Sequence, residues 1–164
     1  MQADALPLEP MTDGVITIRA LEEGDAARLV AGRDDEWRRW LGPGDDAPRP
    51  TACIIVAGEV VGWVDYDTAQ EYLDPGEVNI GYNVFAPHRG NGYASRAVEL
   101  LISYLATFTS FHTATLLIDS HNVASVGVAA RTGFVEQDEA PRDHNLYFKR
   151  PVRAAHLPRK ARLE

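Results

Sequence analysis

The 164-residue sequence has a single cysteine, Cys53, and no apolar run near the roughly 18 residues that a membrane-spanning helix requires. One cysteine cannot form a disulfide within the chain, and Cys53 lies in an apolar segment, as a buried and unreactive thiol usually does. Residues 1–10 hold two acidic side chains, no lysine or arginine and no apolar core, so we expect no secretory signal there. These absences favour a cytoplasmic protein that does not associate with membranes.

Positive charge is also scarce, except at the C-terminal end. The formal net charge is −8, yet residues 150–164 hold five basic residues and one acidic residue, which leaves −12 on residues 1–149. An acidic body repels phosphate backbones, so nucleic acid is not an expected partner. It attracts cationic molecules such as amines, although an acidic surface can also serve solubility alone. The basic tail complements the acidic body of a second copy, so a homodimer is one expectation.

Apolar periodicity and turn residues predict one domain over residues 1–150, followed by a basic tail over residues 151–164. Three helical segments are expected: one bent or two short helices over 25–41, a long amphipathic helix after Gly92, and a short helix over 123–131. The expected strands are 15–18, 52–56, 60–66, 77–85, 113–118, 134–137 and 145–149. Early strands followed by alternating strands and helices predict a mixed α/β (α+β) sheet with helices on its faces.

The most informative segment runs from Val84 to Ser95, where a strand passes through a turn with two glycines directly into a helix. The first amides of a helix have no partner within it, and the helix dipole is positive at that end. Glycine lets the backbone form a concave nest that an anion can approach. The segment therefore predicts a phosphate cradle, with a purely structural turn as the alternative. It is no dinucleotide-binding motif, because Ser95 stands where a third glycine belongs, and it lacks the Lys-Ser/Thr pair of a P-loop.

The spacing instead fits Arg-x-x-Gly-x-Gly/Ala, with Arg89, Gly92 and Ala94 in the defined positions. This pattern resembles the pyrophosphate-binding loop of the GNAT superfamily of acyl-CoA-dependent N-acyltransferases. A second segment, from Asn122 to Gly133-Phe134, is similar to that family's Asn-x-x-Ala/Ser segment ending in Gly-Phe. The likeness extends over residues 15–149. Ile80-Gly81-Tyr82 before the loop resembles the branch that includes the ribosomal-protein N-terminal acetyltransferases.

This resemblance implies a mixed, mostly antiparallel sheet of about six or seven strands that splays at its fourth strand. It also implies direct transfer of an acetyl group from acetyl-CoA to a primary amine of a small molecule or a protein N-terminus. The fourth strand would pair with the pantetheine arm, the glycine loop would bind the pyrophosphate, and the second segment would lie along the cofactor. The implied cofactor-binding residues are Asn83, Val84, Phe85, Arg89, Gly90, Asn91, Gly92, Tyr93, Ala94, Asn122, Ser125 and Arg131. Asn122 can also be a plain helix cap.

The catalytic groups are less well defined than the cofactor loop. An amine must lose a proton to attack, and the candidate bases are Glu77, on the strand entering the site, and Asp119, at the end of the next strand. Many family members carry a tyrosine seven residues after the asparagine, to protonate the leaving thiolate, but this chain has Ala129 there. The remaining candidates for the acid are Tyr93, Ser125 and water, or the thiolate leaves unprotonated, since a thiol has a pKa of about 8.5.

Two other functions compete with an enzyme. Ala129 at the usual acid position favours a non-catalytic acyl-CoA-binding or regulatory module, and the cradle alone is compatible with a nucleotide-binding protein. Five aromatic residues are expected in the core: Trp37, Trp40, Trp63, Tyr66 and Tyr82. The alternative is that one or two of them line an acceptor pocket, with residues 34–36 (Asp-Asp-Glu) as its amine-attracting rim. The five histidines lack ligand-like spacing, so no metal site is expected.

Overall fold

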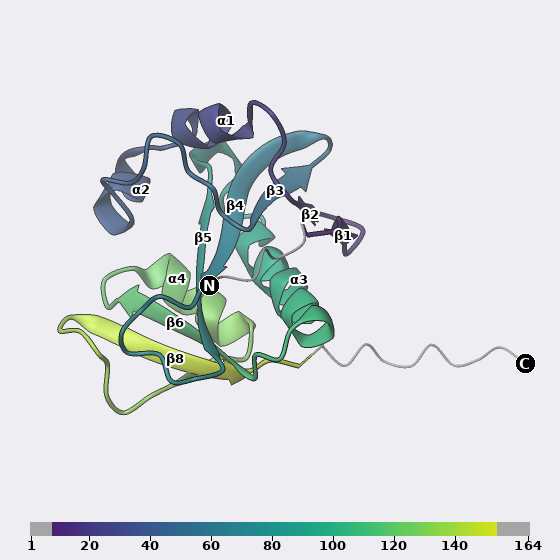
Figure 1. Ribbon diagram of the computed structural model, residues 1–164. Coiled ribbons are helices and arrows are strands. Elements are labelled where there is room, and N and C mark those ends of the chain that lie inside the picture. The colour runs from purple at the N-terminus through teal and green to yellow at the C-terminus, as the bar shows by residue number, and fades with distance from the viewer. Residues whose placement is uncertain (1–7, 154–164) are drawn as a thin grey trace, which may run out of the picture.

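Eight strands build one sheet in the computed structural model, which describes residues 8–153 (Figure 1). The order across the sheet is β1-β2-β3-β4-β5-β6-β8-β7, and neighbours are antiparallel except β5 and β6. The strands are β1 (Met11–Thr12), β2 (Thr17–Arg19), β3 (Ala52–Val56), β4 (Glu59–Asp67), β5 (Glu77–Val84), β6 (Thr113–Asp119), β7 (Val135–Glu136) and β8 (Asn145–Pro151).

This architecture confirms the predicted mixed, mostly antiparallel sheet, with one strand more than expected. The additional strand is β1, which is two residues long and pairs with β2 through Met11 and Ile18. So short a strand has no alternating pattern of its own, and only its partner defines it. Residues 154–164 lie outside the described part of the chain. The prediction of a separate basic tail therefore falls almost entirely on residues that the structure does not describe.

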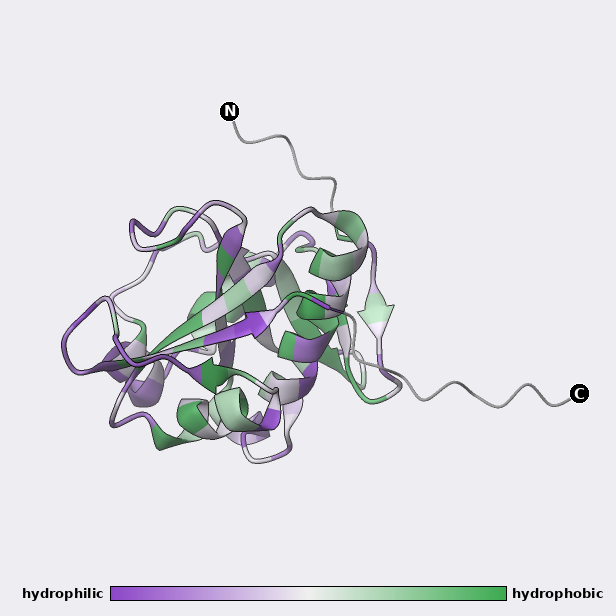
Figure 2. Cartoon of the chain, turned by 90° about the horizontal axis from the view of Figure 1, so that it is seen from below, coloured by the Kyte–Doolittle hydropathy of each residue, from purple (hydrophilic) through white to green (hydrophobic). Residues whose placement is uncertain are grey.

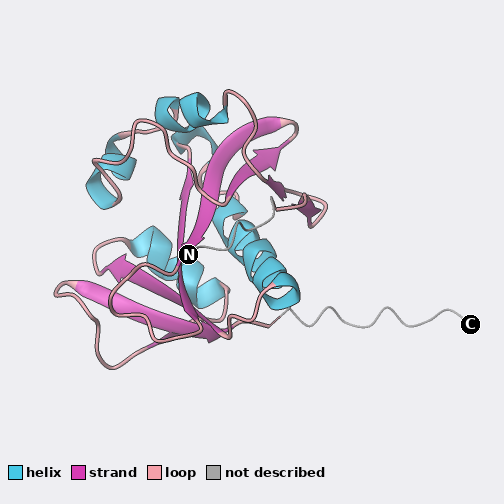
Figure 3. Ribbon diagram, in the orientation of Figure 1, coloured by secondary structure: helices cyan, strands magenta, loops and turns pink. Residues whose placement is uncertain are grey.

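Helices cover both faces of the sheet, as predicted (Figure 3). One face carries α3 (Tyr93–Phe108) and α4 (Val123–Arg131), whose buried residues join the large hydrophobic core. The other face carries α1 (Asp25–Ala31), where Leu29 packs with Cys53 and Phe85 in a smaller cluster; α2 (Asp35–Trp40) follows it along the chain. Apolar residues concentrate in the strands and helices, while the connecting loops are largely hydrophilic (Figure 2).

The sheet splays between its two parallel strands, β5 and β6. Strand β5 pairs with β4 over Asn79–Val84, but pairs with β6 only over Glu77–Asn79. Beyond Asn79 the two strands diverge, as Figures 1 and 3 show. The divergence confirms the splay expected at the fourth predicted strand, and it leaves one edge of residues 80–84 without a strand partner.

A buried ion pair fixes the start of α1. Asp25 is fully buried, and its carboxylate accepts hydrogen bonds from Arg19 at 2.6 Å, from Arg28 at 3.1 Å and from the backbone amide of Glu22 at 2.8 Å. Burial by itself raises the pKa of a carboxyl group. Here the hydrogen bonds from Arg19 and Glu22 outweigh burial, and the pKa of Asp25 falls to about 2.

Candidate active site

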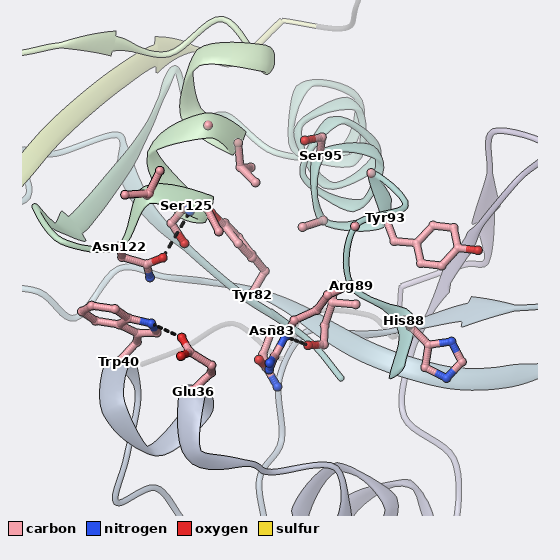
Figure 4. A pocket seen from close by; sticks show the side chains of 18 of the residues that line it. Glu36, Trp40, Tyr82, Asn83, His88, Arg89, Tyr93, Ser95, Asn122 and Ser125 are labelled. Carbon is pink, nitrogen blue, oxygen red and sulfur yellow. Dashed lines mark hydrogen bonds between the residues drawn. The ribbon is translucent and has the colours of Figure 1, made fainter. Parts of the chain in front are cut away.

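A cavity of about 850 Å³ lies where β5 and β6 separate. Its wall combines α2, the C-terminal end of β5, the loop before α3, the first turn of α3 and one side of α4 as far as Arg131 (Figure 4). The predicted cofactor-binding residues Asn83, Val84, Arg89, Gly90, Gly92, Tyr93, Ala94, Asn122, Ser125 and Arg131 all line this cavity. The tertiary structure thus brings together two sequence motifs that are about 30 residues apart.

The loop between β5 and α3 has the conformation that its glycines predict. Gly90 and Gly92 have φ angles of 80° and 77°, in the left-handed region that glycine tolerates best. Gly92 is the N-cap of α3, and no side chain caps that helix. The amide groups that begin α3 therefore face the cavity region without a side-chain acceptor. Such an end of a helix is suited to binding an anion.

Hydrogen bonds from two side chains stabilise this loop, and of these two Arg89 lines the cavity whereas Asn91 does not. The Asn91 amide donates to the carbonyl of His88 at 3.0 Å, and Asn91 is not among the lining residues. Arg89 donates through Nε to the Val84 carbonyl at 2.8 Å. Its guanidinium also binds both carboxylate oxygens of Asp34, at 2.7 and 2.9 Å.

Asp34 connects the glycine loop with α2. It is the N-cap of α2, accepting from the amide of Trp37 at 3.0 Å, while it binds Arg89 from the loop. The hydrogen bond from Arg89 is the main reason that the pKa of Asp34 falls to about 2. The two walls of the cavity are therefore held together by an ion pair that persists at any pH above about 4.

Asn122 has the predicted role of a helix cap and also lies at the cavity wall. It caps α4, because its Oδ1 accepts from the amide of Ser125 at 3.2 Å, and it also lines the cavity. Phe85, by contrast, is not a lining residue. It packs with Leu29 and Cys53 against the other face of the sheet, so its side chain is a core residue.

The structure does not bring Glu77 to the cavity. Glu77 lies at the opposite end of β5, is 6% exposed, and binds Lys149 Nζ at 2.8 Å and the amide of Asp74 at 3.0 Å. Burial raises its pKa, but these two hydrogen bonds more than compensate and the pKa is lowered. A carboxylate held by two donors far from the cavity is a structural ion pair, so the prediction of Glu77 as the base is not supported.

Asp119 is also absent from the cavity wall. It lies at the end of β6, and its carboxylate accepts from the amide of His121 at 2.8 Å, which is the main reason for its lowered pKa. The carboxylate that does line the cavity is Glu36 on α2, whose Oε2 accepts from Trp40 Nε1 at 2.8 Å. Within the described residues it is the only carboxylate among those lining the cavity.

Among the candidate acids, Ser125 and Tyr93 both line the cavity, but their side chains differ in direction. The Tyr93 ring extends away from Ser125 and Asn122 (Figure 4). Tyr82, which was expected in the core, points toward Ser125 instead. Ala129 is fully buried within the core and contributes nothing to the cavity wall.

Sequence reasoning therefore did not single out two of the lining side chains, Glu36 and Tyr82, which it gave only as members of larger groups. Glu36 was named only as one of three acidic residues. Nothing in the sequence shows that the other two form ion pairs, Asp34 with Arg89 and Asp35 with Arg38. In residues 8–153, no three His, Cys, Asp or Glu side chains are grouped as a metal site would require. In the same range, no helix has the length and apolar character needed to cross a bilayer.

The family model for the acetyltransferase (GNAT) domain matches residues 16–135, which is more than half of the chain. The protein therefore belongs to the GNAT acetyltransferase family, and its class is that of the acetyl-CoA-dependent N-acetyltransferases. This confirms the family that the loop and the Asn122 segment predict. No curated protein sequence matches this chain significantly.

Solved structures with the same fold include several acetyltransferases of low sequence identity. The ribosomal-protein-S5-alanine acetyltransferase from Vibrio fischeri is 15% identical with a TM-score of 0.73, covering 88% of this chain and 97% of that one. RimL, a ribosomal L7/L12 α-N-protein acetyltransferase in complex with coenzyme A, is 17% identical with a TM-score of 0.72, covering 90% and 100%. The aminoglycoside acetyltransferase AAC(6')-Ib, in complex with coenzyme A and kanamycin, is 18% identical with a TM-score of 0.71, covering 83% and 94%.

Proposed function

We propose that this protein transfers the acetyl group of acetyl-CoA to a primary amine of a small molecule or a protein N-terminus. The observation that carries the proposal is the cavity at the splay of β5 and β6, with Gly90 and Gly92 in left-handed conformations at the start of α3. The fold is that of N-acetyltransferases that bind coenzyme A, RimL and AAC(6')-Ib among them.

The α3–α4 side of the cavity fits coenzyme A. The amides from Gly90 to Ala94 suit a pyrophosphate, and Arg131 adds a positive charge on the same side. Residues 80–84 of β5 have one edge without a strand partner, and this edge offers backbone groups to an extended pantetheine chain, although the Val84 carbonyl already accepts from Arg89. Acetyl-CoA would supply the thioester carbonyl carbon that the amine attacks.

The α2 side of the cavity suits the acceptor. Glu36 is a carboxylate beside the indole of Trp40, and Trp37 and Leu41 add apolar surface. Since a lysine-like amine has a pKa of about 10.4, it arrives protonated, and a carboxylate both attracts the ammonium ion and accepts its proton, directly or through water. Glu36 therefore replaces Glu77 and Asp119 as the proposed base.

A direct assay tests the function. Purified protein mixed with acetyl-CoA and a panel of N-terminal peptides, polyamines and aminoglycosides should release free thiol, and mass spectrometry should show the acetylated amine. Tight binding of coenzyme A without turnover on any amine would instead favour the non-catalytic acyl-CoA-binding module, which Ala129 at the usual acid position makes the second candidate.

Replacing Glu36 with glutamine should raise the KM for a cationic amine about tenfold, because its charge is lost, and lower kcat about 100-fold, because the proposed base is lost. Coenzyme A binding should stay unchanged, because only the acceptor side is altered. Steady-state kinetics over a range of amine concentrations measures this. Asp35→Asn is the matched control, since Asp35 is on the same helix, pairs with Arg38 and is fully exposed. Equal kinetic effects of the two substitutions would show that Glu36 has no special role.

A further inference from the structure

The Tyr82 hydroxyl is not used by the chemistry described so far. Its oxygen is buried and has no hydrogen-bond partner among the described residues, yet the side chain lines the cavity and points toward Ser125 (Figure 4). A buried hydroxyl without a partner destabilises a fold, and native proteins contain few of them. Retention of this hydroxyl therefore suggests a role in function.

The position of Tyr82 connects it to the reacting end of the cavity. Tyr82 pairs with Val64 of β4, and it lies in the part of β5 that no longer pairs with β6. Ser125 lies in the first turn of α4, where its amide is bound to Asn122. The two side chains thus approach each other from opposite walls of the splay, beside the residues proposed to hold the pantetheine chain.

We propose that the Tyr82 hydroxyl donates a hydrogen bond to Ser125 Oγ in the reacting complex and thereby aims the Ser125 proton at the departing sulfur of coenzyme A. The inference rests on the proposed function. Many family members have a tyrosine at the position of Ala129 that donates a proton to the leaving sulfur, and Tyr82 would support this donation from β5 through Ser125. Ala129 itself is fully buried and cannot reach the cavity.

The transfer step balances without a proton leaving Tyr82. The amine nitrogen forms a bond to the acetyl carbon, the carbon–sulfur bond breaks, and its electron pair stays on sulfur. Before the attack, the ammonium ion gives one proton to Glu36 or water; after it, the nitrogen gives a second proton to water. The thiolate accepts a hydrogen bond from Ser125 and later takes one proton from solvent. A thiol has a pKa of about 8.5, so sulfur can carry this charge briefly.

The chemistry of Tyr82 suits a donor that keeps its proton. Burial raises its pKa to about 12, and the nearby Ser125 hydroxyl and Arg131 guanidinium offset this only in part. The phenol is therefore neutral throughout the working range and offers its proton only in a hydrogen bond. Tyr82 is accordingly a positioning residue, acting through Ser125.

Tyr82→Phe should lower kcat about fivefold to tenfold while the KM for acetyl-CoA and the Kd of coenzyme A stay within twofold. The melting temperature should stay the same or rise, because an unpartnered buried hydroxyl is removed. In a Ser125→Ala background, Tyr82→Phe should have no further effect on kcat. The kinetics use acetyl-CoA and the amine of the panel that is acetylated fastest.

Tyr147→Phe is the matched control. Tyr147 also has a buried hydroxyl without a partner, but it does not line the cavity, so its loss should leave kcat unchanged. If the wild type is active and Tyr82→Phe has the same kcat, the proposed role of Tyr82 is wrong, although the proposed function stands. The same conclusion follows if the losses of kcat in the double variant are additive. Coenzyme A binding without acetyl transfer by the wild type would overturn the proposed function, and this inference with it.

Discussion

Gly92→Val is expected to weaken coenzyme A binding by about 100-fold, or about 2.7 kcal/mol, while the domain stays folded. Gly92 has a φ of 77°, and a β-branched side chain there forces the backbone out of the conformation that presents the first amides of α3. The added Cβ meets no other atom within 4 Å, so the core is not disturbed. Isothermal titration with coenzyme A measures the affinity, and circular dichroism checks the fold.

Gly58→Val is the control for this substitution. Gly58 has a φ of 80°, a Cβ there also meets nothing within 4 Å, and it lies in the turn between β3 and β4, outside the cavity wall. It imposes similar backbone strain without touching the cradle. If both valine variants bind coenzyme A as the wild type does, the pyrophosphate is held elsewhere and the proposed cofactor site is wrong.

Asp25→Asn is expected to lower the free energy of unfolding by about 3 kcal/mol at pH 7, because it leaves the Arg19 guanidinium without its buried counter-charge. Urea denaturation measures this. Asp35→Asn is again the control: Asp35 pairs with Arg38 at 3.0 Å on the surface, and removing such a pair should cost less than about 1 kcal/mol. Similar losses for both variants would mean that the burial of Asp25 is unimportant.

The same carboxylate predicts how stability depends on pH. The pKa of Asp25 is about 2 in the folded protein, below the ordinary value of 3.8, so the folded state binds this proton less readily than the unfolded chain does. The stabilisation is therefore complete above about pH 5 and is lost as the pH falls from 4 toward 2. The difference in stability between wild type and Asp25→Asn should shrink over that range. A constant difference down to pH 2 would contradict the assignment.

Local sequence rules accounted well for the conformation of the α3–α4 side of the cavity. The two glycines before a helix and the capping asparagine before another helix act over a few residues, so their conformations follow from the chain itself. The same holds for the longer strands and for the amphipathic α3. The edge strand β1 was missed because two residues carry no periodic signal, and its pairing with β2 depends on the fold.

The residues that line the α2 side of the cavity could not be predicted from local rules. The sequence puts Glu77 on β5 but does not show that it lies at the end of the strand away from the cavity, and its partner Lys149 is 72 residues away in the sequence. Nor does the sequence of residues 34–36 show that Asp34 forms an ion pair with Arg89 whereas Glu36 lines the cavity.

The amino-acid sequence by itself determined the family, the order of the longer elements and the glycine turn, because each depends on neighbours along the chain. Only the tertiary structure decided which carboxylate lines the cavity, that Phe85 is a core residue, and that Tyr82 points toward Ser125. Those outcomes depend on where β5 parts from β6, and on ion pairs and packing between residues far apart in the sequence.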